Sequence, residues 1–242
     1  MPELPRRNFL FFSSGAALGN LLVPGVASAE EAGGDAPAVD WSASGLVTGK
    51  AKQLRHKEIP GFLSAAQIAP HHTAHYGGAI KAFLTIEAKF EEKFSGGASI
   101  DSFAFDAMQR TKSSRGNSVV LHELYFDGLS PAKAEPGGEL KLAIAKRFGS
   151  LDKWSDDFRA SAKSAAGWAM LVRHPVNRRL YNVVSDEHAQ GPLWLAVPLV
   201  VVDVYEHAFY IDYQNRKNDY VDKFADHIDW DEANRRYRSL EA

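Results

Sequence analysis

The chain has 242 residues, of which 45% are hydrophobic and 24% charged, an ordinary composition for a globular protein. A net charge of −2 excludes the basic surface of a nucleic-acid or anionic-membrane binder, and 14 Phe, 8 Tyr and 5 Trp exclude a long disordered chain. Cysteine is absent, which excludes disulfides, thiolate metal sites and cysteine nucleophiles, so any metal must bind to His, Asp, Glu or backbone oxygen.

Residues 1–29 have the pattern of an export signal. Arg6-Arg7 precede an apolar stretch over 11–26, which ends in the small-x-small sequence Ala27-Ser28-Ala29. The paired arginines indicate the twin-arginine route. The alternative is a retained membrane anchor, but serine, glycine, asparagine and proline interrupt the stretch, whereas a spanning helix needs about 20 apolar residues. We expect a periplasmic or secreted protein that is not stably inserted in a membrane after cleavage.

The region after the signal predicts a tether and then a helical hairpin. Residues 30–58 contain glycine, proline and scattered charge, and we expect a flexible tether there. Ser64 can cap a helix over 64–94, which Pro70 should bend because proline lacks the N–H that the helix ladder needs. A second helix is expected over 100–125. Together they predict an N-terminal helical domain over 59–131.

The second half, 132–242, predicts an α/β domain. Helices are expected at 138–147, 151–165, 206–213, 220–227 and 231–239, and strands at 167–173, 180–185 and 199–203. The turn-rich link 174–177 joins the first two strands as a hairpin. The predicted class is α+β, with an N-terminal α-helical hairpin followed by a domain that contains a three-stranded antiparallel sheet.

Three histidine-containing segments carry the candidate chemistry. His71 and His75 share one helix face, although most pairs at this spacing bind no metal. His122 lies in an apolar run, where a hydrogen-bonded buried imidazole is the ordinary explanation. Asp203 and His207 follow another apolar run and are costly there unless they are paired or bound to metal. A serine triad is disfavoured because no serine lies in a nucleophile elbow, so a metal is the better explanation.

Residues 203–210, DVYEHAFY, resemble the D-x-W-E-H-A-Y/F-Y signature of the iron/manganese superoxide dismutases. Downstream, Tyr213, Asn215, Asp219 and Tyr220 fit its continuation Y-x-N-x-x-x-D-Y. The segment 71–75 is similar to the family's H-H-x-x-H. His122 with Leu129-Ser130-Pro131 is similar to N-H-x-x-x-W-x-x-L-S-P, and Gly167-Trp168 to the G-W that opens its sheet. These motifs occur in the family's order over residues 58–240.

The resemblance implies a metal site and an activity. The positions that match the family's metal ligands are His71, His122, Asp203 and His207, with a water or hydroxide completing the set. It implies one iron or manganese ion per subunit, and these ligand types do not choose between the two metals. The implied activity is disproportionation of superoxide, a small anion, to oxygen and hydrogen peroxide.

The resemblance also implies a homodimer, which could pair into a tetramer. Glu206 matches the glutamate that hydrogen-bonds the partner's metal histidine, and Tyr210 and His75 match a pair that meets across the same interface. Such contacts orient the imidazole ligand. Trp168 and Phe126 match apolar residues at the site, and Tyr205 replaces the signature tryptophan, so its hydroxyl needs a partner. The implied catalytic set is His75, His188 and Tyr210.

Two positions depart from the family pattern. Ala79 stands where the family has a tyrosine eight residues after the first metal histidine; Tyr76 is nearby in sequence and would point elsewhere on a regular helix. Ser118 stands where iron-type members have a glutamine, and His188, with Gln190 behind it, is the candidate for the manganese-type position. These departures keep two alternatives open: a metal-binding protein with weak or no dismutase activity, or another oxygen or peroxide chemistry at the same centre.

Overall fold

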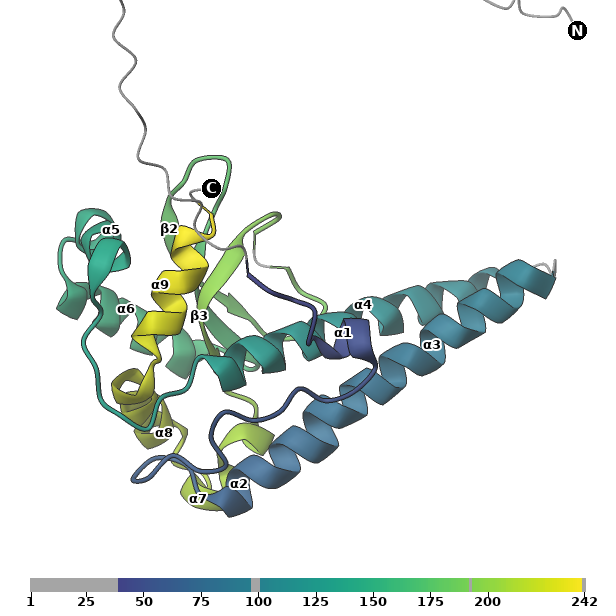
Figure 1. The fold of residues 1–242 in the computed structure, drawn as a ribbon, viewed down its shortest axis with the longest axis horizontal. Coiled ribbons are helices and arrows are strands. Elements are labelled where there is room, and N and C mark those ends of the chain that lie inside the picture. Colours follow the sequence, from purple (N-terminus) through teal and green to yellow (C-terminus); the bar gives the residue numbers. More distant parts are fainter. Residues whose placement is uncertain (1–38, 97–100, 192, 241–242) are drawn as a thin grey trace, which may run out of the picture. The chain divides into compact units, whose positions relative to one another are not determined.

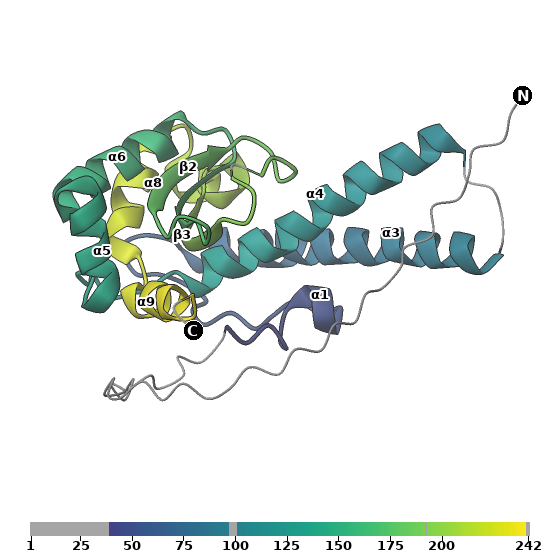
Figure 2. The same cartoon turned by 90° about the horizontal axis from the view of Figure 1, so that it is seen from above.

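A computed structural model describes residues 39–96, 101–191 and 193–240. The first half of this part is helical (Figure 1). Its elements are α1 (Gly45–Thr48), α2 (Ala65–Pro70), the π-helix η1 (His71–Tyr76), α3 (Gly77–Gly96) and α4 (Ser102–Asp127). Figures 1 and 2 show α3 and α4 packed side by side as a helical hairpin, as the sequence predicts.

The helix starts follow from local capping. The Ser64 hydroxyl accepts a hydrogen bond from the Gln67 N–H at 3.2 Å, and the Asp101 carboxylate accepts one from the Ala104 N–H at 2.9 Å. The sequence predicts a bend at Pro70. At this residue the structure shows a change of helix type: α2 ends at Pro70 and the next six residues form the π-helix η1. The wider turn of a π-helix changes which side chains face the core.

The second half combines helices with a sheet. Its helices are α5 (Gly138–Phe148), α6 (Leu151–Ser164), η2 (Glu206–Ala208), α7 (Tyr210–Tyr213), α8 (Lys217–Phe224), η3 (Ala225–His227) and α9 (Trp230–Arg238). Its strands are β1 (Trp168–Arg173), β2 (Leu180–Ser185) and β3 (Val197–Asp203). They form an antiparallel sheet of order β2-β1-β3, which confirms the predicted fold class.

The sheet places one of the candidate residues at a buried strand end. Strand β1 is central and every one of its residues is buried. Its first residue, Trp168, pairs with Asp203 on β3 and Ser185 on β2. Helix α6 contacts β1 and β2, while α4 and α9 contact β3. Asp203 therefore ends β3, the sheet strand that contacts helix α4 of the hairpin, and its side chain is fully buried.

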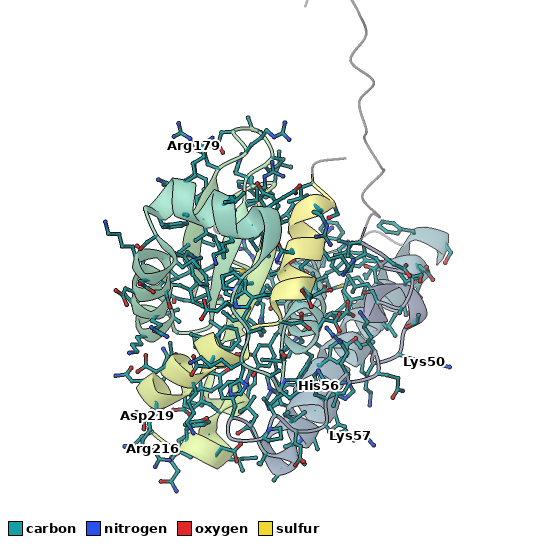
Figure 3. All side chains as sticks on the ribbon, turned by 60° about the vertical axis from the view of Figure 1, so that its left-hand side comes forward. Lys50, His56, Lys57, Arg179, Arg216 and Asp219 are labelled. Carbon is teal, nitrogen blue, oxygen red and sulfur yellow. The ribbon has the colours of Figure 1, made fainter. Side chains whose placement is uncertain are left out.

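The segment 39–58 differs from the expected flexible tether. The buried Glu123 carboxylate accepts hydrogen bonds from the Ser44 hydroxyl at 3.1 Å and the Gly45 N–H at 2.7 Å. Further along, Arg55 forms an ion pair with Asp229 at 2.8 Å. The segment still has polar side chains on its outer side: Figure 3 shows Lys50 and Lys57 pointing away from the body. The sequence composition reflects this exposed side and not the few buried contacts that hold the segment.

Two sequence expectations concern residues outside this description. The export signal over 1–29 and the first part of the tether, up to residue 38, lie outside the described residues. Within the described residues, none of the helices combines the length and apolar character needed to cross a membrane.

Candidate metal centre

Four candidate ligands from four elements converge at one place. His71 begins η1, His122 lies in α4, Asp203 ends β3 and His207 lies in η2. One potential ligand atom from each residue lies within 4.8 Å of the other three. His71, His122 and Asp203 are at most 1% exposed, and the His207 side chain is 18% exposed. Residues that are up to 136 positions apart in the chain thus form one buried cluster.

Asp203 is at the centre of the cluster. Its Oδ2 atom lies 3.2 Å from Nε2 of His71, 3.1 Å from Nε2 of His207 and 3.7 Å from Nε2 of His122. Its other oxygen, Oδ1, accepts a hydrogen bond from the Tyr205 N–H at 3.0 Å. The Tyr220 hydroxyl donates to the Asp203 carbonyl at 2.8 Å. Backbone and side chain are therefore both fixed, and Oδ2 is directed at the three imidazoles.

Two hydrogen-bond acceptors, Nε2 of neutral His122 and Oδ2 of Asp203, face each other at 3.7 Å. Its Nδ1 lies 2.7 Å from the Ser118 carbonyl oxygen, which can only accept, so Nδ1 carries the proton. In the neutral ring Nε2 then presents a lone pair, and this buried atom has no hydrogen-bond partner among the described residues. The nearest cluster oxygen is Asp203 Oδ2, itself an acceptor. A cation between the two atoms would satisfy both, and this is the observation that best fits a metal ion.

Burial sets the protonation states that metal ligands need. It lowers the pKa of His71 and lowers that of His122 to about 3, because desolvation disfavours the imidazolium form. Burial alone would raise the pKa of Asp203, but hydrogen bonds from His207 and His71 outweigh it and hold that pKa below its usual value. Neutral imidazoles beside a carboxylate are the N/O donor set that iron and manganese accept.

Comparison with known proteins agrees with this geometry. Residues 136–236 match the C-terminal domain of iron/manganese superoxide dismutases. A manganese superoxide dismutase of Haloferax volcanii is 37% identical over 169 residues, 69% of this chain and 83% of the relative. An iron superoxide dismutase of Aquifex pyrophilus is 35% identical over 190 residues, 76% of this chain and 88% of the relative. The chain belongs to the iron/manganese superoxide dismutase family.

Aromatic side chains pack around the cluster, and they are the ones that the family resemblance predicts there. The Trp168 ring lies edge-on to His122 at 5.2 Å between centroids, and Phe126 lies 4.9 Å from His71. Tyr205, which replaces the family's tryptophan, stacks on His207 at 5.2 Å. Its hydroxyl finds the partner it needs by donating to the Asp186 carbonyl at 3.0 Å. The substitution therefore keeps the packing and satisfies the added polar atom.

Of the two candidates for the family's glutamine, His188 lies at the site. The Trp168 Nε1–H donates to His188 Nδ1 at 3.0 Å, and the His188 ring lies 6.1 Å from that of His122. Because Nδ1 accepts, neutral His188 carries its proton on Nε2. Gln190 instead accepts from the Asp186 N–H through its Oε1 atom. Ser118 contacts His122 through its carbonyl and so holds a ligand.

The Tyr76 hydroxyl is directed away from the metal centre and does not replace the hydroxyl that Ala79 lacks. Ala79 is buried in the core, and Tyr76 is only 1% exposed. The Tyr76 hydroxyl donates to Glu123 at 2.8 Å and accepts from the Lys52 N–H at 3.0 Å. Its ring lies 6.2 Å from that of His122, but its hydroxyl is held by Glu123 and the 39–58 segment. Sequence reasoning missed Glu123, although an acidic residue inside the apolar run around His122 was a usable signal.

The residues expected at a subunit interface lie on the outside of this chain. His75 is exposed and stacks on His207, with 3.9 Å between ring centroids. Glu206 is exposed, and Tyr210 is 50% exposed. The next residue, Ile211, is 55% exposed. These residues are placed where a second subunit would be able to contact them.

Proposed function

We propose that this protein is a superoxide dismutase with one iron or manganese ion per subunit, held by His71, His122, Asp203 and His207. In the reaction, two superoxide anions and two protons give one molecule of oxygen and one of hydrogen peroxide. The paired acceptors, His122 Nε2 and Asp203 Oδ2, carry the proposal. The related dismutases include both manganese and iron proteins, so the comparisons leave the choice of metal to experiment.

The groups around this site fix the ligands and restrict access to it. When bound, iron or manganese supplies a one-electron couple with a water or hydroxide ligand of lowered pKa. The Ser118 carbonyl holds the His122 ring in the tautomer that presents Nε2. Asp203 contributes one negative charge that offsets part of the charge of the ion. Trp168, Phe126 and Tyr205 surround the imidazoles and restrict access to small molecules.

We assign catalytic roles to His75, His188 and Tyr210. His188 is the best placed to substitute for the family's glutamine, because its proton lies on Nε2 and its ring is fixed by Trp168. In a homodimer, which could pair further into a tetramer, His75 and Tyr210 would meet across the interface. Glu206 would accept a hydrogen bond from the partner's His207 there. The exposure of His75, Glu206 and Tyr210 in the single chain supports this arrangement.

We further propose that the protein is exported to the periplasm or secreted by the twin-arginine route. Arg6-Arg7, the apolar stretch over 11–26 and Ala27-Ser28-Ala29 support this proposal. That route carries folded proteins, which allows the metal to be bound before export.

A second candidate function is metal binding with little dismutase activity. It is favoured by one observation: Ala79 has no hydroxyl, and the Tyr76 hydroxyl is held by Glu123. Both functions predict that the metal-free protein takes up one ion per chain and that His122→Ala abolishes this uptake, which metal analysis measures. Only the first predicts rapid superoxide consumption by the loaded protein, with iron and manganese preparations assayed separately.

A further inference from the structure

A buried amide, that of Gln67, joins the helix that leads into His71 to the segment that carries His207. Gln67 lies in α2 and is 1% exposed. Its Nε2 atom donates to the His207 carbonyl at 2.7 Å, and its Oε1 atom accepts from the Ile211 N–H at 2.9 Å. Both ends of the amide are therefore used on one short segment, η2 and the start of α7. One of the two hydrogen bonds is to the backbone carbonyl of the candidate ligand His207 itself.

The residue directly after this helix is a candidate ligand. His71 is the C-cap of α2 and begins η1, four residues after Gln67. Ser64, which caps this helix, forms a second connection: its N–H and hydroxyl each donate to the Asp212 carboxylate at 2.7 Å. Four hydrogen bonds thus hold the start of α2 against the η2–α7 segment. The two ligands that follow or belong to these segments, His71 and His207, have their ring centroids 4.9 Å apart.

His207 is the ligand that most needs external positioning. Its side chain is 18% exposed, whereas the other three candidate ligands are almost fully buried. It belongs to a 3-10 segment of three residues, which has little helical hydrogen bonding of its own. A shift of this backbone would move the His207 Nε2 atom away from Asp203 and would also displace Tyr210 at the proposed interface.

We propose that Gln67 is a positioning residue for the metal centre: its amide holds the backbone of His207 so that the imidazole completes the ligand set to which His71, the residue directly after α2, also belongs. The inference rests on the proposed metal site. Losing such a contact behind a ligand typically reduces metal affinity or activity about 10–100-fold.

Three variants and one control test this role. Gln67→Glu keeps an acceptor for the Ile211 N–H but has no donor for the His207 carbonyl, while Gln67→Met removes both hydrogen bonds at similar volume. Asp212→Ala removes the two hydrogen bonds from Ser64 between the same two segments, and it does so without changing a buried residue. Gln53→Glu, the same chemical change at an exposed position, is the matched control. Each protein is loaded with manganese or iron, and three properties are measured: the visible absorption of the bound metal, its rate of loss to a chelator, and the unfolding temperature of the metal-free protein.

We expect Gln67→Glu and Gln67→Met to shift the absorption band and to lose metal about 10–100-fold faster, with a smaller effect in the same direction for Asp212→Ala and none for Gln53→Glu. A lower unfolding temperature with unchanged absorption and unchanged metal loss would show a merely structural role and overturn the inference. If the Gln67 variants do not fold, unchanged absorption and metal loss in Asp212→Ala would overturn it. A wild-type chain that takes up no metal would instead overturn the proposed function, and this inference with it.

Discussion

Replacing Tyr76 with phenylalanine separates a structural hydroxyl from a catalytic one. The hydroxyl donates to Glu123 and accepts from the Lys52 N–H, so it joins η1, α4 and the 39–58 segment. A hydrogen bond to a charged group contributes about 1.5–3 kcal/mol, and an ordinary one contributes about 1 kcal/mol. Tyr76→Phe should therefore lower the free energy of unfolding of the metal-free protein by about 2–4 kcal/mol. Urea denaturation of both proteins measures this difference.

The same variant should leave the chemistry of the site nearly unchanged, because the hydroxyl points toward Glu123. We expect the azide affinity of the loaded protein to stay within about twofold, a free-energy difference of about 0.4 kcal/mol. Tyr181→Phe, which removes a hydroxyl that accepts a hydrogen bond from the exposed Asn177 amide at 2.8 Å, is the control and should cost about 1 kcal/mol or less. Undiminished stability would contradict the structural role of the hydroxyl, and an azide affinity changed tenfold or more would show that Tyr76 acts at the metal.

Three further predictions concern the interface, export and position 79. Glu206→Ala should weaken the proposed dimer and speed metal loss about 10–100-fold, because in that dimer the partner's His207 would lose its acceptor; unchanged dimer mass and metal content would contradict this. Changing Arg6-Arg7 to Lys-Lys should keep the protein in the cytoplasm, as measured by fractionation, and export at the normal rate would favour the general secretory route. Ala79→Tyr should lower azide affinity, measured by absorbance titration, if the new ring reaches the site; equal affinities in the two proteins would mean that position 79 faces the core alone.

Strand positions were predictable because their signals are local. Residues 180–185 match β2 at both ends, and the turn-rich link after Arg173 correctly predicts a hairpin. The helical hairpin was predictable for the same reason, since Ser64 is a cap and the apolar spacing follows the helix period. The π-helix η1 was not predictable, because π-helical turns are rare and have no local sequence signal comparable to a cap; in the fold η1 buries His71 and Tyr76.

The cluster was accessible from sequence only through the family motifs. His122 alone is best explained as a hydrogen-bonded core histidine, and no spacing rule connects it to Asp203, 81 positions away. Once the strand and helix carrying them are packed, the two side chains face each other. Glu123 and Gln67 illustrate what remains hidden: each is one buried polar residue whose partners lie in segments that only the tertiary fold brings near.

The most direct test is the rate of superoxide decay per bound metal ion. Stopped-flow absorbance would follow superoxide in the presence of the iron-loaded, manganese-loaded and metal-free proteins, with His122→Ala as the variant that lacks one ligand. With at least one of the two metals, we predict a decay that increases in proportion to bound metal, that is absent from the metal-free protein and that is lost in His122→Ala. One tightly bound ion per chain with no decay above the spontaneous rate for either metal would contradict the dismutase assignment.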